Sequence, residues 1–218
     1  MRFLTSKPGM TALAGSLLIL SLGARAVPAA TSYGHATPTP KEFALRQEMR
    51  KLWEDHVTWT RLVIVSTAAN LPDLDATTQR LLQNQADIGN AIKPFYGEPA
   101  GSKLTELLRA HIIGAADILA AAKANDTTKL EAAKTSWYAN ADEISAFLSG
   151  ANPRNWPLSD MKAMMREHLD LTLSEAVNQL QGKYAESVAD YDKVHDEILQ
   201  MADMLSDGIA KQFPKNLR

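Results

Sequence analysis

The 218-residue chain contains no cysteine. This excludes disulfide-stapled scaffolds, cysteine-ligated zinc or iron–sulfur sites, covalent c-type haem and thiol catalysis. Glycine and proline number only 11 and 10, too few for a collagen-like or low-complexity chain. No segment alternates polar and apolar residues over the length of a strand, so we expect no β-sheet. The Walker loop and the G-x-G-x-x-G motif are also missing, which argues against nucleotide-dependent chemistry.

The first 26 residues have the pattern of an export signal. An apolar run at residues 11–22 follows the basic residues Arg2 and Lys7 and precedes a small-x-small cleavage pattern at Ala24-Arg25-Ala26. The run is too short to span a membrane but has the length of a signal-peptide core. We therefore expect residues 1–26 to be a signal peptide and the protein to be exported, to a periplasm or to the exterior. No cysteine follows the run, so we expect no lipid attachment and no stable membrane anchor.

The charge balance bears on partners. Three of the 23 basic residues and none of the 25 acidic ones lie in residues 1–26, so the remaining chain carries a net charge of −5. A mildly acidic protein of this kind is a poor candidate for binding nucleic acid or an anionic membrane surface. Residues 27–40 are small, polar and proline-containing, a composition typical of a flexible linker, and His35 within them is interpreted as a solvated residue.

From residue 41 to the C-terminus apolar residues recur at spacings of three and four, the period of an amphipathic helix. We expect one helical domain over residues 41–218. The predicted helices cover residues 41–70, 75–93, 101–124, 127–149, 158–181 and 184–212. The fold class is all-α, an antiparallel bundle with four long central helices (41–70, 101–124, 158–181 and 184–212) plus two shorter ones. No strict internal sequence repeat is evident.

Four of the five histidines lie on the apolar stripe of a predicted helix, each near the middle of its helix. They are His56, His111, His168 and His195. Mid-helix positions of an antiparallel bundle meet at one level, so these imidazoles could converge in one layer. Buried imidazoles need hydrogen-bond partners or a metal ion that accepts their lone pairs.

Two carboxylates share faces with these histidines. Asp192 lies three residues before His195, and Glu175 lies seven residues after His168. We interpret the six residues as candidate ligands of Zn, Cu, Fe or Mn, because nitrogen and oxygen donors do not choose among these metals. Haem held by two of the histidines is a less favoured alternative. Whether Asp87 and Asn140 reach the site depends on how their helices pack.

Other functions remain open at this stage. The histidines could be structural core residues, hydrogen-bonded to Tyr138, Tyr191 or Asp192, in a non-catalytic binding module for a protein partner or a small apolar ligand. A hydrolase or transferase of unknown substrate is a third hypothesis. Neither a Gly-x-Ser-x-Gly motif nor an H-E-x-x-H motif is present, so no catalytic residue is assigned.

Several stretches carry a family resemblance. They are residues 52–61 (LWEDHVTWTR), 87–97 (DIGNAIKPFYG), 137–144 (WYANADEI), 155–157 (NWP), 191–195 (YDKVH) and 201–208 (MADMLSDG). Together they resemble a group of small secreted bacterial helical-bundle proteins of unknown function, over most of residues 50–214. Members of that group are sometimes labelled glycosyltransferase. The resemblance implies a helical fold and export, and the lack of predicted strands argues against a sugar-nucleotide transferase.

Overall fold

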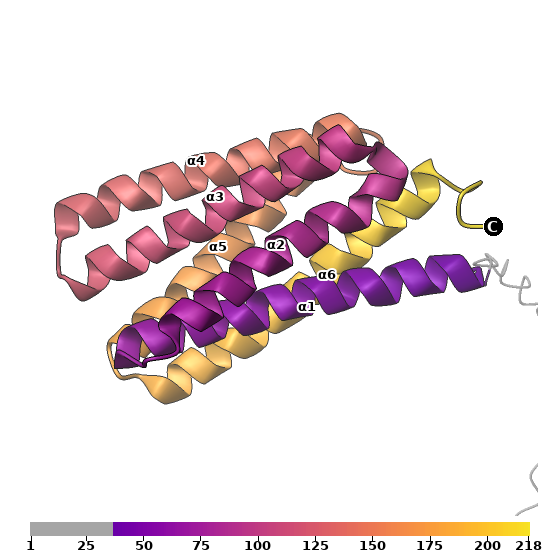
Figure 1. Cartoon of the computed structure of the whole chain (residues 1–218). Coiled ribbons are helices and arrows are strands. Elements are labelled where there is room, and N and C mark those ends of the chain that lie inside the picture. The colour runs from indigo at the N-terminus through magenta and orange to yellow at the C-terminus, as the bar shows by residue number, and fades with distance from the viewer. Residues whose placement is uncertain (1–36) are drawn as a thin grey trace, which may run out of the picture. The chain divides into compact units, whose positions relative to one another are not determined.

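The structure, a computed structural model, describes residues 37–218, which form six α-helices and no strand (Figure 1). The helices are α1 (Pro40–Ala69), α2 (Leu74–Tyr96), α3 (Glu98–Lys123), α4 (Thr127–Ala151), α5 (Leu158–Leu180) and α6 (Tyr184–Gln212). The predicted all-α fold is confirmed, and each predicted helix lies within three residues of the observed one. The predicted signal peptide and the linker up to residue 36 lie outside the described residues.

The helices differ in length less than the sequence suggested. The two that we expected to be shorter, α2 and α4, have 23 and 25 residues, and α5 also has 23. The reason in α2 is that the helix continues through Pro94 and ends only at Tyr96, before Gly97 with its positive φ of 83°. A proline lacks one backbone donor, and in the last turn of a helix this loss does not stop the chain from completing the turn.

The bundle is a closed ring of three helical hairpins. Each helix packs against the next along the chain, and α6 packs back against α1. Helix α1 also contacts α3 and α5 across the middle of the ring. Figure 1 shows the α3–α4 hairpin running beside the other helices, with the α3–α4 turn and the α2–α3 junction at opposite ends. The first helices of the three hairpins, α1, α3 and α5, are therefore the ones that meet inside.

The three hairpins repeat one pattern of buried positions. Counted from the histidine of each first helix, the positions −7, −3, +1 and +8 are buried and apolar in all three hairpins. Position −7 holds Met49, Leu104 and Met161, and position −3 holds Trp53, Leu108 and Met165. Position +1 holds Val57, Ile112 and Leu169, and position +8 holds Ile64, Leu119 and Ala176. The second helices match in the same way around Asn84, Asn140 and Glu197. Counted from these residues, the buried position −3 holds Leu81, Trp137 and Val194. Position +4 holds Ile88, Ile144 and Met201, and position +8 holds Ile92, Leu148 and Leu205.

Hydrogen bonds support this register between the first two hairpins. The Nδ2 atom of Asn84 donates to the carbonyl of Leu52 (2.9 Å), and that of Asn140 donates to the carbonyl of Leu107 (3.2 Å). Leu52 and Leu107 each lie four residues before the histidine of their helix. The chain thus contains an internal threefold repeat of helical hairpins, which the sequence alone did not reveal because side-chain identity is kept at few positions.

The contact between α6 and the connector from α4 to α5 depends on a glycine. A Cβ atom at Gly208 in α6 would lie 2.0 Å from Nε1 of Trp156, which is itself 2% exposed. We expect Gly208→Ala to lower the free energy of unfolding by about 1–3 kcal/mol, because overpacking a close-packed core forces side chains and backbone to shift. Urea unfolding of the two proteins measures this effect.

The matched control for that variant is Gly150→Ala in α4. No atom lies within 4 Å of a Cβ built at Gly150. Alanine there should be neutral or stabilise the protein by up to about 1 kcal/mol, because it favours the helix over glycine. Equal effects of the two substitutions would mean that Trp156 does not constrain the backbone at Gly208.

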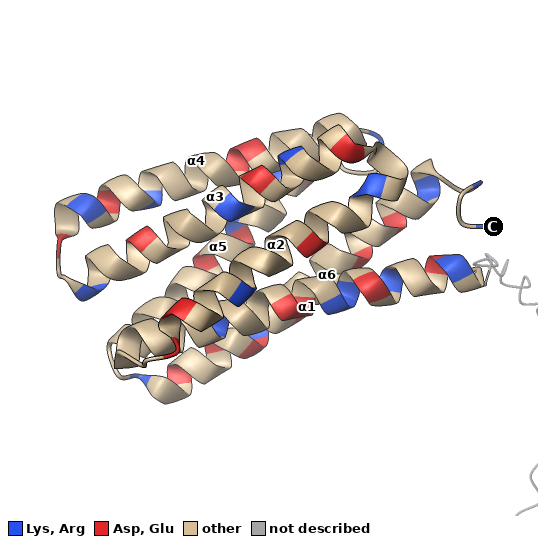
Figure 2. Ribbon diagram, in the orientation of Figure 1, with Lys and Arg blue, Asp and Glu red and all other residues tan. Residues whose placement is uncertain are grey.

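The outer surface carries charges of both signs. Figure 2 shows acidic and basic residues interspersed along the helices, without a face of one sign in that view. Among the described residues, no helix is long and apolar enough to cross a membrane.

Candidate functional site

Three histidines meet inside the ring of helices. His56 of α1, His111 of α3 and His168 of α5 are each only 3–4% exposed. The ring centres of His56 and His168 lie 5.8 Å apart, and His111 is near enough to both to interact with them electrostatically. We call these three residues the histidine triad. They hold equivalent places in the three hairpins, so the internal repeat itself brings them together.

The triad divides the apolar core into two parts. The buried residues three positions before each histidine belong to the larger apolar cluster, and those eight positions after belong to a smaller one. A polar layer between two apolar clusters is costly unless its groups find partners. The hydrogen-bond partners of the triad therefore show how this polar layer is stabilised.

Each triad histidine is held at Nδ1 by a side chain of the following helix. The partners are Nε2 of Gln85 on α2 (3.2 Å from His56), Oδ1 of Asn140 on α4 (3.0 Å from His111) and Oε2 of Glu197 on α6 (2.9 Å from His168). Every partner lies 29 residues after its histidine. Among residues 37–218, none forms a side-chain hydrogen bond with Nε2 of a triad histidine.

Two of these hydrogen bonds fix the ring proton on Nδ1. The carboxylate of Glu197 can only accept, so Nδ1 of His168 donates to it. Asn140 uses its Nδ2 to donate to the carbonyl of Leu107, which leaves Oδ1 to accept from Nδ1 of His111. In both imidazoles the neutral ring then has a lone pair on Nε2.

His56 faces an amide nitrogen instead of an oxygen. Nε2 of Gln85 also donates to the carbonyl of Leu81 (2.8 Å) and to Oδ1 of Asn84 (3.1 Å), so the amide nitrogen is the atom that faces Nδ1. The amide nitrogen has two hydrogens, and these two oxygens account for both, so the contact with Nδ1 does not assign the ring proton of His56. Within the triad, lone pairs are thus assigned at Nε2 of His111 and His168.

Unpaired polar atoms concentrate around the triad. Among the described residues, five buried side-chain nitrogen or oxygen atoms have no hydrogen-bond partner: Trp53 Nε1, Arg80 Nη1, Gln85 Oε1, Thr172 Oγ1 and Glu197 Oε1. Four of the five belong to a residue that binds a triad histidine or lies within about one helical turn of one. Buried polar groups are rarely left unpaired, and a cluster of them points to a water, an ion or another ligand.

Two of the three triad histidines are uncharged at neutral pH. Burial, together with His168 and His111, holds the pKa of His56 well below its usual value. Burial and the nearby His168 lower the pKa of His111 to about 3. Neutral imidazoles are the form that binds metal ions.

The fourth predicted histidine lies outside this layer. The side chain of His195 on α6 is 32% exposed, and its Nε2 lies 3.1 Å from Oε1 of Glu54 on α1. Asp192, one turn earlier, is exposed. The expected layer of four imidazoles is thus a layer of three, because His195 faces the rim of the α1–α6 contact rather than the interior.

Glu175 is buried but already paired. Its side chain is 1% exposed and lies 2.7 Å from Nη1 of Arg61 on α1, which also donates to the hydroxyl of Ser187 (3.0 Å). Burial raises the pKa of Glu175, and the guanidinium of Arg61 opposes this rise. The carboxylate thus belongs to an ion pair two helical turns from His168.

The partners that sequence reasoning considered for the histidines differ from the observed ones. Tyr138 donates to Asp170, and the hydroxyl of Tyr191 lies 3.3 Å from that of Thr58. Asp87 binds the side chain of Gln83 at the surface.

Of the residues considered earlier, only Asn140 reaches a triad histidine. Gln85 and Glu197 were missed. The signal that could have found them is the constant separation of 29 residues between each histidine and a polar residue of the next helix.

No preformed metal centre is present in this part of the chain. Within residues 37–218, no group of three or more histidine, aspartate or glutamate side chains is arranged to hold a metal ion. The triad therefore offers nitrogen donors of the type that metals bind, but they are not arranged around one point as in a metal centre.

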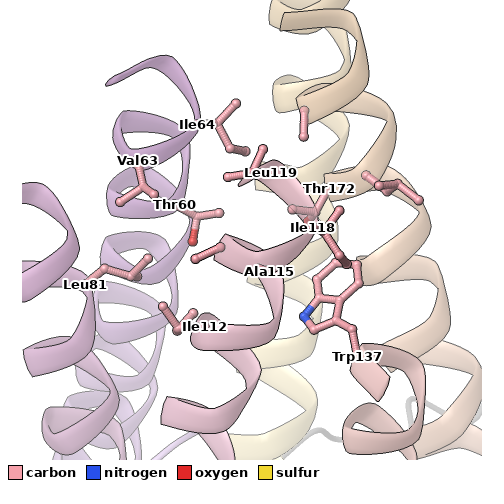
Figure 3. A pocket seen from close by; sticks show the side chains of 13 residues that line it. Thr60, Val63, Ile64, Leu81, Ile112, Ala115, Ile118, Leu119, Trp137 and Thr172 are labelled. Carbon is pink, nitrogen blue, oxygen red and sulfur yellow. The ribbon is translucent and has the colours of Figure 1, made fainter. Parts of the chain in front are cut away.

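An apolar cavity lies next to the triad. Its volume is about 30 Å³, and its wall includes Thr60, Ala115 and Thr172, the residues four positions after each triad histidine. Four residues rise about 6 Å along a helix, so the cavity occupies the next level above the triad. Figure 3 shows the lining side chains converging on this space from several helices.

In comparisons with known proteins, no protein-family model, no curated protein and no solved structure matches the chain.

Proposed function

We propose that the protein is an exported binding protein and that the histidine triad is its site for a transition-metal ion. The observation that supports this most is the pairing of every Nδ1 atom with a side chain of the following helix. Metal-binding histidines are commonly held in this way, because a hydrogen bond at one ring nitrogen fixes the orientation of the other. The unpaired polar atoms around the triad support the same interpretation.

His111 and His168 are the first two ligands in this proposal. Each donates its Nδ1 proton to an oxygen, Oδ1 of Asn140 or Oε2 of Glu197, and so keeps a lone pair on Nε2. A carboxylate behind an imidazole also raises the basicity of the ligand nitrogen. Glu197 is then a positioning residue for His168.

His56 would be the third ligand after a local change. Its Nδ1 faces the amide nitrogen of Gln85 rather than an oxygen. Rotation of the amide would bring Oε1 of Gln85, which has no partner, to Nδ1 and free Nε2 for the ion. The three rings must also draw together, since their present arrangement is not that of a metal centre.

Three imidazole nitrogens suit Zn, Cu, Fe or Mn, and the donor set does not choose among them. His195, Asp192 and Glu175 are not part of the proposed site.

Elemental analysis of the full chain, produced without an affinity tag and incubated with each ion in turn, tests the proposal. We expect close to one metal ion per chain in the wild type. His111→Gln and His168→Gln should each lose at least nine-tenths of it, because each removes a ligand. Glu197→Gln should weaken the affinity by about 10- to 100-fold, the usual effect of losing a group that orients a ligand.

His195→Gln is the matched control, since this histidine is on a helix of the same bundle but outside the triad. It should bind as much metal as the wild type. Absence of metal in the wild type with every ion would refute the proposal, and so would equal metal content in His168→Gln and His195→Gln.

A further inference from the structure

Methionines are concentrated beside one histidine of the triad. The six methionines of residues 37–218 all lie in the larger apolar cluster or pack against it, and the smaller cluster contains none. Five of the six belong to the third hairpin, which carries His168. Thioether sulfur is a soft ligand that selects monovalent copper among the metals that imidazole binds. The methionines therefore bear on which ion the triad binds.

Met201 on α6 is the methionine that helix geometry directs toward the triad. It lies one turn after Glu197, which binds Nδ1 of His168, and the two residues share the inner face of α6. Side chains of a helix extend toward its N-terminus, so the thioether of Met201 reaches back to the level of Glu197 and His168. The residue is only 1% exposed. Met165, three residues before His168 on α5, extends away from the triad by the same rule.

The internal repeat shows that packing alone does not require a methionine at this position. The equivalent residues of the first two hairpins are Ile88 and Ile144, and both are fully buried. Isoleucine fills the same place in two of the three hairpins, and swaps between aliphatic core residues of similar volume are usually tolerated. The third hairpin thus has a sulfur atom where the other two have only carbon.

The buried carboxylates do not supply the remaining ligand. Residues 37–218 contain three of them, and each binds another group. Glu175 pairs with Arg61, and Asp190 binds a lysine and two polar side chains of α5. Glu197 binds His168 at Nδ1 rather than on the Nε2 side, where the lone pair is free. A thioether is therefore the donor left to complete the site.

From these observations we propose that the ion of the triad is monovalent copper, held by Nε2 of His111, Nε2 of His168 and the sulfur atom of Met201. This inference rests on the proposed function and names its metal. Thioether and imidazole ligands together select Cu(I), whereas structural zinc sites are almost always closed by Cys, His or carboxylate ligands. His56 stays available as a further nitrogen ligand.

X-ray absorption at the copper edge tests the ligand set directly. The full chain, untagged, is loaded with an equimolar amount of Cu(I) under argon in the presence of a reductant. We expect sulfur as well as nitrogen among the nearest neighbours of copper in the wild type. Met201→Ile should lose the sulfur neighbour and keep the nitrogen neighbours, because isoleucine preserves the packing of the equivalent positions Ile88 and Ile144.

Competition with a Cu(I) chelator measures the affinity. Met201→Ile should weaken Cu(I) binding about ten-fold or more, because losing even a group that only orients a ligand costs about 10- to 100-fold. Zinc binding, followed with a zinc-sensitive dye, should not change. The matched control is Met161→Leu, which removes another buried methionine of the same hairpin two turns before His168 and inserts the residue type of its counterpart Leu104. It should bind Cu(I) as tightly as the wild type.

Two results would overturn this assignment: copper with nitrogen or oxygen neighbours alone in the wild type, or equal Cu(I) affinity of the wild type and Met201→Ile. The first requires no variant, so the inference stays testable if the substitution unfolds the chain. A chain that binds zinc or another divalent ion at the triad but no Cu(I) would refute the assignment and leave the proposed function standing. A chain that binds no ion at all would refute both.

Discussion

The metal-free protein should lose stability steeply as the pH falls from about 6.5 toward 4. His56 and His111 have lowered pKa values in the folded state, whereas in the unfolded chain they titrate near the ordinary value of 6.5. Below pH 6.5 the unfolded state therefore binds more protons, and acid favours unfolding. Each histidine contributes about 1.4 kcal/mol per pH unit over this range. Above about pH 6.5 both histidines are neutral in the folded and the unfolded chain, so this loss of stability is absent.

Other groups with shifted pKa values change the stability in the opposite direction or at a lower pH. Asp203, whose pKa is lowered by its hydrogen bond to Arg50, contributes stability that is lost only below about pH 4, the ordinary range of an aspartate. The raised pKa of Glu175 has the opposite sign and gives stability that is lost as the pH rises through it. The loss expected between pH 6.5 and 4 therefore comes mainly from His56 and His111.

Urea unfolding at a series of pH values measures the slope. His111→Gln should remove about half of the slope between pH 6 and 4, because it leaves one of the two strongly shifted histidines. Asn140→Ala, which keeps both shifted histidines, should retain most of the slope. Equal slopes in the wild type and His111→Gln would show that the triad does not govern the acid response.

The sequence predicted the helices well because apolar periodicity is a local signal. The boundaries of α1, α5 and α6 are off by at most one residue. The mid-helix placement of His56, His111 and His168 also predicted their meeting, since helices of similar length in an antiparallel bundle bring their centres to one level. His195 satisfied the same rule but lies at the rim of the α1–α6 contact. Periodicity identifies a face of a helix without separating its middle from its edge.

The partners of the triad could not be predicted in the same way. Gln85, Asn140 and Glu197 are three different residue types, and each contacts a histidine 29 positions away on another helix. Such contacts depend on the packing of helix pairs rather than on neighbours in the sequence. The threefold repeat brings each partner to nearly the same level, with Gln85 one position after Asn84, the counterpart of Asn140 and Glu197. The repeat becomes visible only when buried positions are compared between the three hairpins.

The ion pair between Arg61 and Glu175 leads to the second large effect. We expect Arg61→Met to lower the free energy of unfolding by about 3–5 kcal/mol, because it leaves a buried carboxylate without its partner. The side chain of Glu175 is 1% exposed, and the other groups near it cannot replace a guanidinium 2.7 Å away. Urea unfolding at pH 7 measures the loss.

The internal repeat indicates which substitution should restore the stability. Glu175 lies seven residues after its histidine, and the equivalent residues of α1 and α3 are Val63 and Ile118, which are buried and apolar. The bundle therefore accepts an aliphatic side chain at this position. Replacing a buried ion pair by apolar residues is often neutral or stabilising, whereas removing one partner is not. The double variant Arg61→Met/Glu175→Leu should thus recover to within about 1.5 kcal/mol of the wild type.

The pH dependence of the single variant separates lost charge pairing from lost packing. Without Arg61, burial and the nearby Asp190 raise the pKa of Glu175 further, so the folded state takes up a proton more readily than the unfolded chain. The deficit of Arg61→Met relative to the wild type should then shrink as the pH falls toward 4.5, while that of the double variant stays constant. A deficit that is the same at pH 7 and pH 4.5 would instead assign the effect to the contact of Arg61 with the ring of Tyr191, whose centre lies 5.3 Å from the guanidinium carbon.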